Sequence, residues 1–135
     1  MSAARATLAA LIAAASLGAA GCDDDGEPAL FPADYAATYQ EVRNCRFSLE
    51  HDLMRIRVLA APDALAVYTG RTGPFPEGAV VLKEEYADTD TACAGPIVSF
   101  TAMQKLPAGA SPATLDWTWQ ETDARRKTLV SRRGR

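Results

Sequence analysis

The stretch FPEGAVVLKEEY, Phe75 to Tyr86, decides how the chain is expected to fold. Pro76 and Gly78 mark a turn, four apolar residues follow, and then come Lys, Glu and Glu at positions 83–85. A turn followed by a short apolar run predicts a strand that leaves a hairpin. The same pattern fits an ordinary strand of a packed sheet or one wall of a binding pocket, so the surrounding segments must decide between them.

Three later segments continue the strand pattern. They span residues 97–106, 114–122 and 127–133, and a tight turn is expected at residues 123–126. In DWTWQ, Trp117 and Trp119 alternate with polar residues, so both indoles fall on one face of a strand.

The first half of the chain is predicted to be mixed. Spacings of four and three between Tyr35, Tyr39 and Val42 predict a helix of about three turns over residues 32–45. Residues 52–61 read as a strand, and residues 62–70 as a short helix that starts at a proline and is closed by Gly70. The predicted fold class is α+β: a largely antiparallel β-sheet with one longer N-terminal helix and a short second helix, the helices covering one side.

The N-terminus reads as an export signal. Residues 1–21 carry one positive charge and then an Ala/Leu/Ile run, and they end in AAG directly before Cys22. This predicts a lipoprotein signal peptide at 1–21, lipidation of Cys22, an acidic tether at 22–33 and a folded domain at 34–135. Ala19 stands where a leucine would strengthen the lipidation motif, so plain secretion remains an alternative. Either way we expect an exported protein, and with the lipid a membrane-anchored one that faces the periplasm or the cell surface.

Two cysteines remain in the mature chain, Cys45 and Cys93. In an oxidising compartment they predict one disulfide, although free thiols or metal ligation remain alternatives. A metal site is under-supplied with ligands, because His51 is the only histidine.

Composition limits the classes of partner. The chain is 48% hydrophobic and 23% charged, which is a globular balance. Basic residues gather at the C-terminus, but export argues against nucleic acid as the partner, and a solvated chain end explains them.

The sequence offers little support for hydrolytic or glycosidic chemistry. Ser48, His51 and Asp52 are close in sequence, but no G-x-S-x-G elbow is present. Glu84 and Glu85 are consecutive, so on a strand they point to opposite faces and cannot flank one scissile bond.

Taken in order, the segments CRFSLEHDLMRIRVLAAPDALAVYTG, FPEGAVVLKEEY, FTAMQKLPAG and DWTWQE resemble the cytochrome P-460 family, from about Tyr35 to about Ser131. The resemblance implies a small exported protein that binds a c-type haem and performs redox chemistry on hydroxylamine or nitric oxide. It also implies a homodimer and a redox partner. Some family members carry a lysine-to-haem cross-link, for which Lys83 and Lys105 are the candidates here; for each, a solvated charge at a strand end is the competing interpretation.

The chain departs from the family at the haem-attachment motif. No C-x-x-C-H is present, and the sequence ends TLVSRRGR where that motif would follow. Truncation and divergence both explain this, and we expect weak or absent haem binding. His51 is the one candidate iron ligand, although a lone histidine more often serves as a hydrogen-bonding residue.

The alternative is a non-catalytic ligand-binding or interaction module on the same scaffold. The cofactor-binding candidates are Lys83, Trp117 and Trp119. A pocket bounded by six apolar residues would favour ligand binding, whereas a packed core there would favour a structural role; the six are Val80, Leu82, Phe100, Met103, Trp117 and Trp119.

Overall fold

The computed structural model describes residues 26–132. The expected signal peptide at 1–21, the lipidation site Cys22 and residues 133–135 lie outside the described residues. The elements are, in order, α1 (Tyr35–Thr38), β1 (Gln40–Phe47), β2 (Arg55–Ala60), α2 (Pro62–Gly70), β3 (Val80–Tyr86), β4 (Ser99–Lys105), the 3-10 turn η1 (Pro112–Thr114), β5 (Trp117–Asp123) and β6 (Thr128–Arg132). No helix among these residues is long and apolar enough to cross a membrane.

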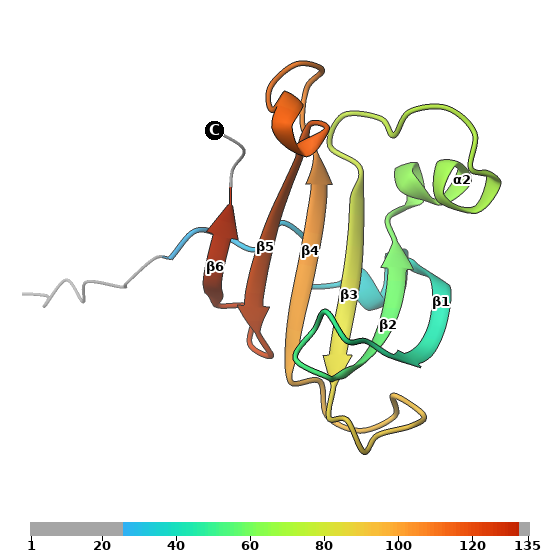
Figure 1. The fold of residues 1–135 in the computed structure, drawn as a ribbon, viewed down its shortest axis with the longest axis vertical. Coiled ribbons are helices and arrows are strands. Elements are labelled where there is room, and N and C mark those ends of the chain that lie inside the picture. Colours follow the sequence, from blue (N-terminus) through green and yellow to red (C-terminus); the bar gives the residue numbers. More distant parts are fainter. Residues whose placement is uncertain (1–25, 133–135) are drawn as a thin grey trace, which may run out of the picture.

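One six-stranded sheet forms the body of the described region (Figure 1). Each strand pairs antiparallel with the next along the chain, in the order β1-β2-β3-β4-β5-β6. The expected turn at the end of β5 is present, because the backbone N–H of Arg126 donates to the carbonyl of Asp123 at 2.9 Å. The α+β class and the largely antiparallel sheet are therefore confirmed.

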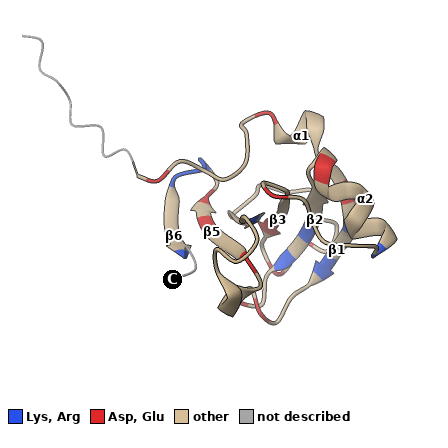
Figure 2. Ribbon diagram, turned by 90° about the horizontal axis from the view of Figure 1, so that it is seen from above, with Lys and Arg blue, Asp and Glu red and all other residues tan. Residues whose placement is uncertain are grey.

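One face of the sheet, which we call the covered face, carries Leu82, Glu84 and Phe100. The N-terminal segment lies across it, with the Phe31 ring 5.0 Å and the Tyr35 ring 5.5 Å from the Phe100 ring, centroid to centroid. Figure 2 shows α1 on this side of the sheet. Phe31 and Phe100 are buried, and burying a ring of this size stabilises the fold by about 2 kcal/mol.

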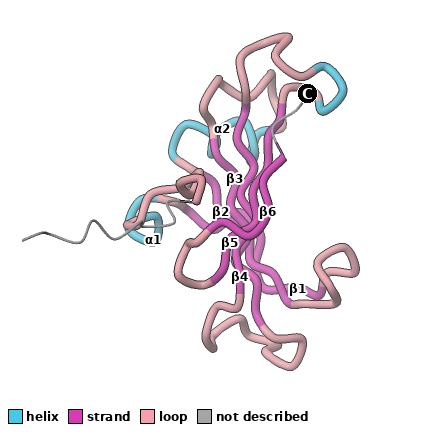
Figure 3. The backbone as a smooth tube through the Cα atoms, turned by 90° about the vertical axis from the view of Figure 1, so that its left-hand side faces the viewer, coloured by secondary structure: helices cyan, strands magenta, loops and turns pink. Residues whose placement is uncertain are grey.

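The opposite face, which we call the open face, carries Lys83, Met103 and Trp117. The pairing of β1 with β2 is interrupted twice, between Glu41 and Arg43 and between Arg43 and Arg46. Irregularities of this kind bend a strand. In the side view, α1 and β1 lie on opposite sides of the central strands (Figure 3). The bend lets the β1–β2 loop, residues 48–54, fold over the open face.

The prediction of a longer N-terminal helix is wrong. The helix α1 has four residues, and Tyr39 already has an extended backbone with φ −85° and ψ 149°. Val42 lies in β1, which pairs with β2 from Gln40 to Phe47 with two interruptions. The tyrosine and valine spacing fits a helix locally, but Tyr39 and Val42 are also good strand formers, and pairing with a strand distant in sequence overrides the local preference.

The second helix has the predicted bounds, residues 62–70, but Gly70 does not cap it. Pro62 occupies the first turn, and Gly70 is the last helical residue. The left-handed residue that ends the helix is Arg71, with φ 51°, rather than the glycine. The helix α2 contacts β1, β2 and β3 at the edge of the sheet, which places it beside the open face.

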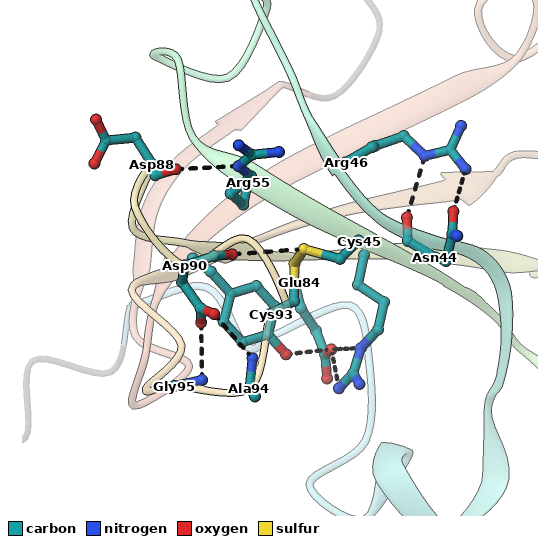
Figure 4. Close-up of a disulfide and its surroundings, with 12 residues drawn as sticks. Asn44, Cys45, Arg46, Arg55, Glu84, Asp88, Asp90, Cys93, Ala94 and Gly95 are labelled. Carbon is teal, nitrogen blue, oxygen red and sulfur yellow. Dashed lines mark hydrogen bonds and ion pairs between the residues drawn. A yellow bond between two sulfur atoms is a disulfide. The ribbon is translucent and has the colours of Figure 1, made fainter.

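The predicted disulfide is present. Cys45 of β1 and Cys93 of the β3–β4 loop are joined across a sequence separation of 48 residues (Figure 4). In the same loop the Asp90 carboxylate accepts hydrogen bonds from the backbone N–H groups of Ala94 and Gly95, at 3.2 and 2.8 Å. These bonds lower the pKa of Asp90. The disulfide thus ties an internally braced loop to the edge strand.

Candidate functional site

The open face carries a largely apolar pocket. Its volume is about 310 Å³, and its walls come from β2, β3, β4, β5, α2 and the α2–β3 connection. Phe75 stands edge-on to Trp117, with ring centroids 5.1 Å apart. The seven lining residues are Val58, Tyr68, Phe75, Val81, Lys83, Met103 and Trp117.

Lys83 is the one charged residue in that lining. Its ammonium donates a hydrogen bond to Nε2 of His51, with Nζ and Nε2 3.0 Å apart. On the other side of His51, Nδ1 lies 2.8 Å from Oγ of Ser48. Both ring nitrogens of the imidazole are therefore engaged.

The β1–β2 loop holds His51 in this place by its backbone. Asp52 and Leu53 both adopt left-handed conformations, with φ 48° and 64°. The turn is closed by two hydrogen bonds, from the Met54 N–H to the His51 carbonyl at 2.8 Å and from the Ser48 N–H to the Met54 carbonyl at 2.9 Å. A non-glycine residue in this region is uncommon, and two in succession reverse the chain tightly enough to direct the imidazole back over β3.

A second, polar pocket of about 260 Å³ lies beyond His51 on the same face. Its carboxylates come from the loop, from β3 and from β5. Glu85 is buried and accepts hydrogen bonds from the hydroxyls of Ser99, at 2.5 Å, and Thr101, at 2.6 Å. The lining residues are Glu50, His51, Asp52, Glu85, Thr101, Trp119 and Glu121.

Burial shapes the protonation of the Lys83–His51 pair. Desolvation lowers the pKa of Lys83, although the carboxylates of Glu85 and Glu50 oppose this. Desolvation and the charge of Lys83 both lower the pKa of His51. Two cations 3.0 Å apart would repel each other. Lysine is the stronger base, so the ammonium keeps the proton near neutral pH and the imidazole is neutral.

Ser48 and His51 do meet, as their closeness in sequence allowed, but they do not form a hydrolytic triad. The group that contacts the far nitrogen of the imidazole is a lysine, whereas a triad needs a carboxylate there. Glu85 Oε1 is 4.0 Å from that nitrogen, beyond hydrogen-bonding distance. A neighbouring cation weakens the imidazole as a base for Ser48.

Glu84 points to the covered face, as expected from the alternation along β3. It is 2% exposed, and it accepts hydrogen bonds from the hydroxyls of Tyr35 at 2.9 Å and Tyr86 at 2.8 Å. Tyr35 donates to Oε1, whereas Tyr86 shares Oε2 with Arg57, whose Nε and Nη2 donate to it at 2.7 and 2.6 Å. Burial, followed by the Glu84 carboxylate, raises the pKa of both tyrosines. This carboxylate is fully partnered and holds the N-terminal segment on the sheet. An acidic residue within an apolar strand was the one sign of it in the sequence.

The structure brings together only part of the predicted site. Lys83 and Trp117 line the same pocket, and Met103 lies between them. Trp119 is on the same face but lines the polar pocket. Lys105 lies outside the lining, with its ammonium 5.6 Å from the centroid of the Trp117 ring.

Of the six residues considered for a pocket wall, only Met103 and Trp117 line the open-face pocket. Val80, Leu82 and Phe100 are buried in the core of the covered face. Period-two alternation puts them on the side of the sheet opposite to Lys83, since Val80 and Leu82 have the parity of Glu84. Tyr68, Phe75 and Val58 take the missing places in the wall.

The described residues do not fit a covalently attached haem. Cys45 and Cys93 are bonded to each other and have no free thiol for a thioether. Both nitrogens of His51 are engaged, one with Ser48 and one with Lys83. Residues 26–132 also hold no group of three or more His, Cys, Asp or Glu residues placed to bind a metal ion.

Comparison with known proteins adds no family to this picture. No protein-family model matches the chain, and a search of curated proteins finds no match.

Proposed function

We propose that the domain binds a small apolar or aromatic molecule in the open-face pocket. The observation that supports this is a cavity of about 310 Å³ with three aromatic walls and a single amine at one end. Ligand sites are typically concave, mostly apolar and equipped with a few polar groups that orient the ligand, and this volume lies at the small end of their range. A molecule with one or two rings matches it.

The setting of this proposal comes from the sequence. The chain resembles the cytochrome P-460 family in segments spread over residues 35–131, and its first 22 residues read as a lipoprotein signal with Cys22 as the acylated residue. We therefore propose an exported, lipid-anchored domain with a P-460-like scaffold, whose pocket faces the periplasm or the cell surface. The expected tether at 22–33 is shortened by the structure, because the chain from Glu27 to Phe31 is packed on the sheet; only the residues before it would hold the domain off the membrane.

Haem-based oxidation of hydroxylamine is the function that the resemblance implies, and we propose that it is impaired here. The mutual bond of Cys45 and Cys93 supports this, because it leaves no cysteine in the described residues for haem attachment. A pyridine-haem spectrum of the purified protein checks it. Stoichiometric c-type haem in that spectrum would overturn this part of the proposal.

Calorimetric titration with 2-naphthalenemethanol tests the binding function. We expect saturable binding with one site per chain. In Met103→Trp the larger indole fills the pocket from β4, so affinity should fall at least about tenfold, a loss of roughly 1.4 kcal/mol in binding free energy.

Leu129→Trp is the matched control, because it adds the same indole at an exposed position of β6 that lines neither pocket. Its affinity should equal that of the wild type. Equal affinity in all three proteins, with folding of each verified by circular dichroism, would show that the alcohol does not bind in this pocket.

A further inference from the structure

Lys83 is placed unlike an ordinary surface lysine. Its side chain comes from the central strand β3, is half-buried, and ends between the apolar pocket and the polar pocket. Within residues 26–132, no carboxylate lies within 4.0 Å of its ammonium. Its hydrogen-bond partner is the imidazole of His51. A lysine with a partner of this kind can give up a proton without breaking an ion pair.

His51 is placed to receive that proton. Nε2 is 3.0 Å from the lysine nitrogen, and Ser48 fixes the ring from the other side at 2.8 Å. Proton transfer between these two atoms needs no rearrangement of the loop. The imidazole is neutral before the transfer and is flanked by Glu85, whose carboxylate oxygen at 4.0 Å favours the imidazolium after it.

The charges around the amine disfavour an anionic ligand. Glu50 and Asp52 of the loop, Glu85 of β3 and Glu121 of β5 all line the polar pocket next to it. A ligand carboxylate brought to Lys83 would meet these like charges, whereas a neutral carbonyl group would not. The pocket wall from α2 contributes Tyr68, whose side chain carries no carboxylate.

We propose that Lys83 captures a small apolar or aromatic aldehyde as an imine, with His51 taking up and returning the proton. This rests on the proposed function, because the same pocket must first bind the ring of the ligand. It adds the chemical class of that ligand and a covalent step.

The step is balanced without any redox partner. His51 Nε2 accepts a proton from the Lys83 ammonium, and the lone pair of the neutral amine attacks the carbonyl carbon. The carbonyl π pair moves to oxygen, and one proton passes from the attacking nitrogen to that oxygen to give a neutral carbinolamine. The imidazolium returns its proton to the hydroxyl group, and water leaves as the C=N bond forms, so His51 is neutral again and the imine nitrogen keeps its last proton. The Lys83 ammonium and the aldehyde thus give a protonated imine and water.

Reductive trapping tests the inference. The purified full-length mature protein is incubated with 2-naphthaldehyde and sodium cyanoborohydride at neutral pH, and the adducts are located by peptide mass mapping. We expect one rapid adduct at Lys83 in the wild type. Lys105, which lies near Trp117 but outside the pocket lining, serves as the internal comparison and should react at least about tenfold more slowly.

Three variants sharpen the result. Lys83→Arg keeps the positive charge and should lose the rapid adduct, while Lys105→Arg should keep it. His51→Gln should retain Lys83 as the modified site but slow its trapping several-fold, and its rate should keep rising with pH where the wild-type rate has levelled. A wild-type pH profile in His51→Gln would overturn the role of His51.

The outcomes separate this inference from the proposed function. If 2-naphthalenemethanol binds in the pocket but the aldehyde is trapped no faster at Lys83 than at Lys105, the imine is wrong and the pocket stands. If neither compound binds or reacts selectively, both proposals are wrong. Should Lys83→Arg fail to fold, the mapped site and the Lys83-to-Lys105 rate ratio in the wild type still decide the matter.

Discussion

Replacing Glu84 by glutamine tests the account of the covered face most sharply. The variant keeps the shape of the side chain but removes its charge and replaces one acceptor oxygen by an NH₂ donor. At present Tyr35, Tyr86 and Arg57 all donate to Glu84. At least one of these donors must lose its acceptor, and the guanidinium of Arg57 loses its closest counter-charge.

The expected cost is about 3 kcal/mol of unfolding free energy. Removing one partner of a buried ion pair costs 3–5 kcal/mol, and the lower end applies because the Arg57 side chain is 34% exposed and water screens it. For a domain of about this size, that loss lowers Tm by roughly 12–20 °C.

Urea denaturation followed by circular dichroism measures this loss, and Glu85→Gln is the matched control on the same strand. Among the described residues, Glu85 accepts side-chain hydrogen bonds from the hydroxyls of Ser99 and Thr101, which can rotate to accept from an amide instead. We expect a loss of about 1 kcal/mol or less for the control. A loss for Glu84→Gln no larger than that for Glu85→Gln would refute the account of Glu84 as the group that fastens the N-terminal segment.

Three further predictions concern stability and pH. The pKa values of Tyr35 and Tyr86 are raised above the ordinary 10.0, so the stability that these tyrosines contribute is present below pH 10 and is lost as pH rises further. Alkaline denaturation should therefore start at a higher pH in the wild type than in Glu84→Gln, and tyrosinate absorbance measures it. Replacing both Cys45 and Cys93 by serine should cost about 4 kcal/mol from loop closure over 48 residues, and an unchanged urea midpoint would contradict this. The pKa of His51 is lowered below the ordinary 6.5, so the stability that the neutral imidazole contributes is present above pH 6.5 and is lost as pH falls. The free energy of unfolding should therefore fall less steeply between pH 7 and 5 in His51→Gln than in the wild type. Equal slopes in the two proteins would count against a desolvated imidazole.

The sheet could largely be predicted from local patterns. Turn residues such as Pro76 and Gly78 bounded β3, period-two alternation placed Glu84 and Glu85 on opposite faces, and the cysteine count supplied the disulfide. The strand β1 was missed, because its hydrogen bonds go to β2 and its local spacing equally suits a helix. Strand pairing depends on a partner that a local pattern does not contain.

The candidate site was predictable only in part, for a related reason. Lys83 and Trp117 stood out as an amine and an indole on strands, and they do line one pocket. The contact of His51 with Lys83 depends on a loop that reverses through Asp52 and Leu53, neither of which is a glycine. Which of the two sheet faces the N-terminal segment covers was also beyond local pattern. The separation of Phe100 from Met103 was not, because residues three apart on one strand point to opposite faces.

The central claim is that the open-face pocket holds a small apolar or aromatic molecule, and a nuclear Overhauser measurement tests it most directly. The protein is labelled with ¹³C at methionine methyl groups and titrated with 2-naphthalenemethanol. Met103 lines the pocket, whereas Met54 of the β1–β2 loop does not and serves as the internal reference. The account predicts strong Overhauser contacts from the naphthyl protons to the Met103 methyl and none to Met54. Bound alcohol with no contact to Met103 would contradict it.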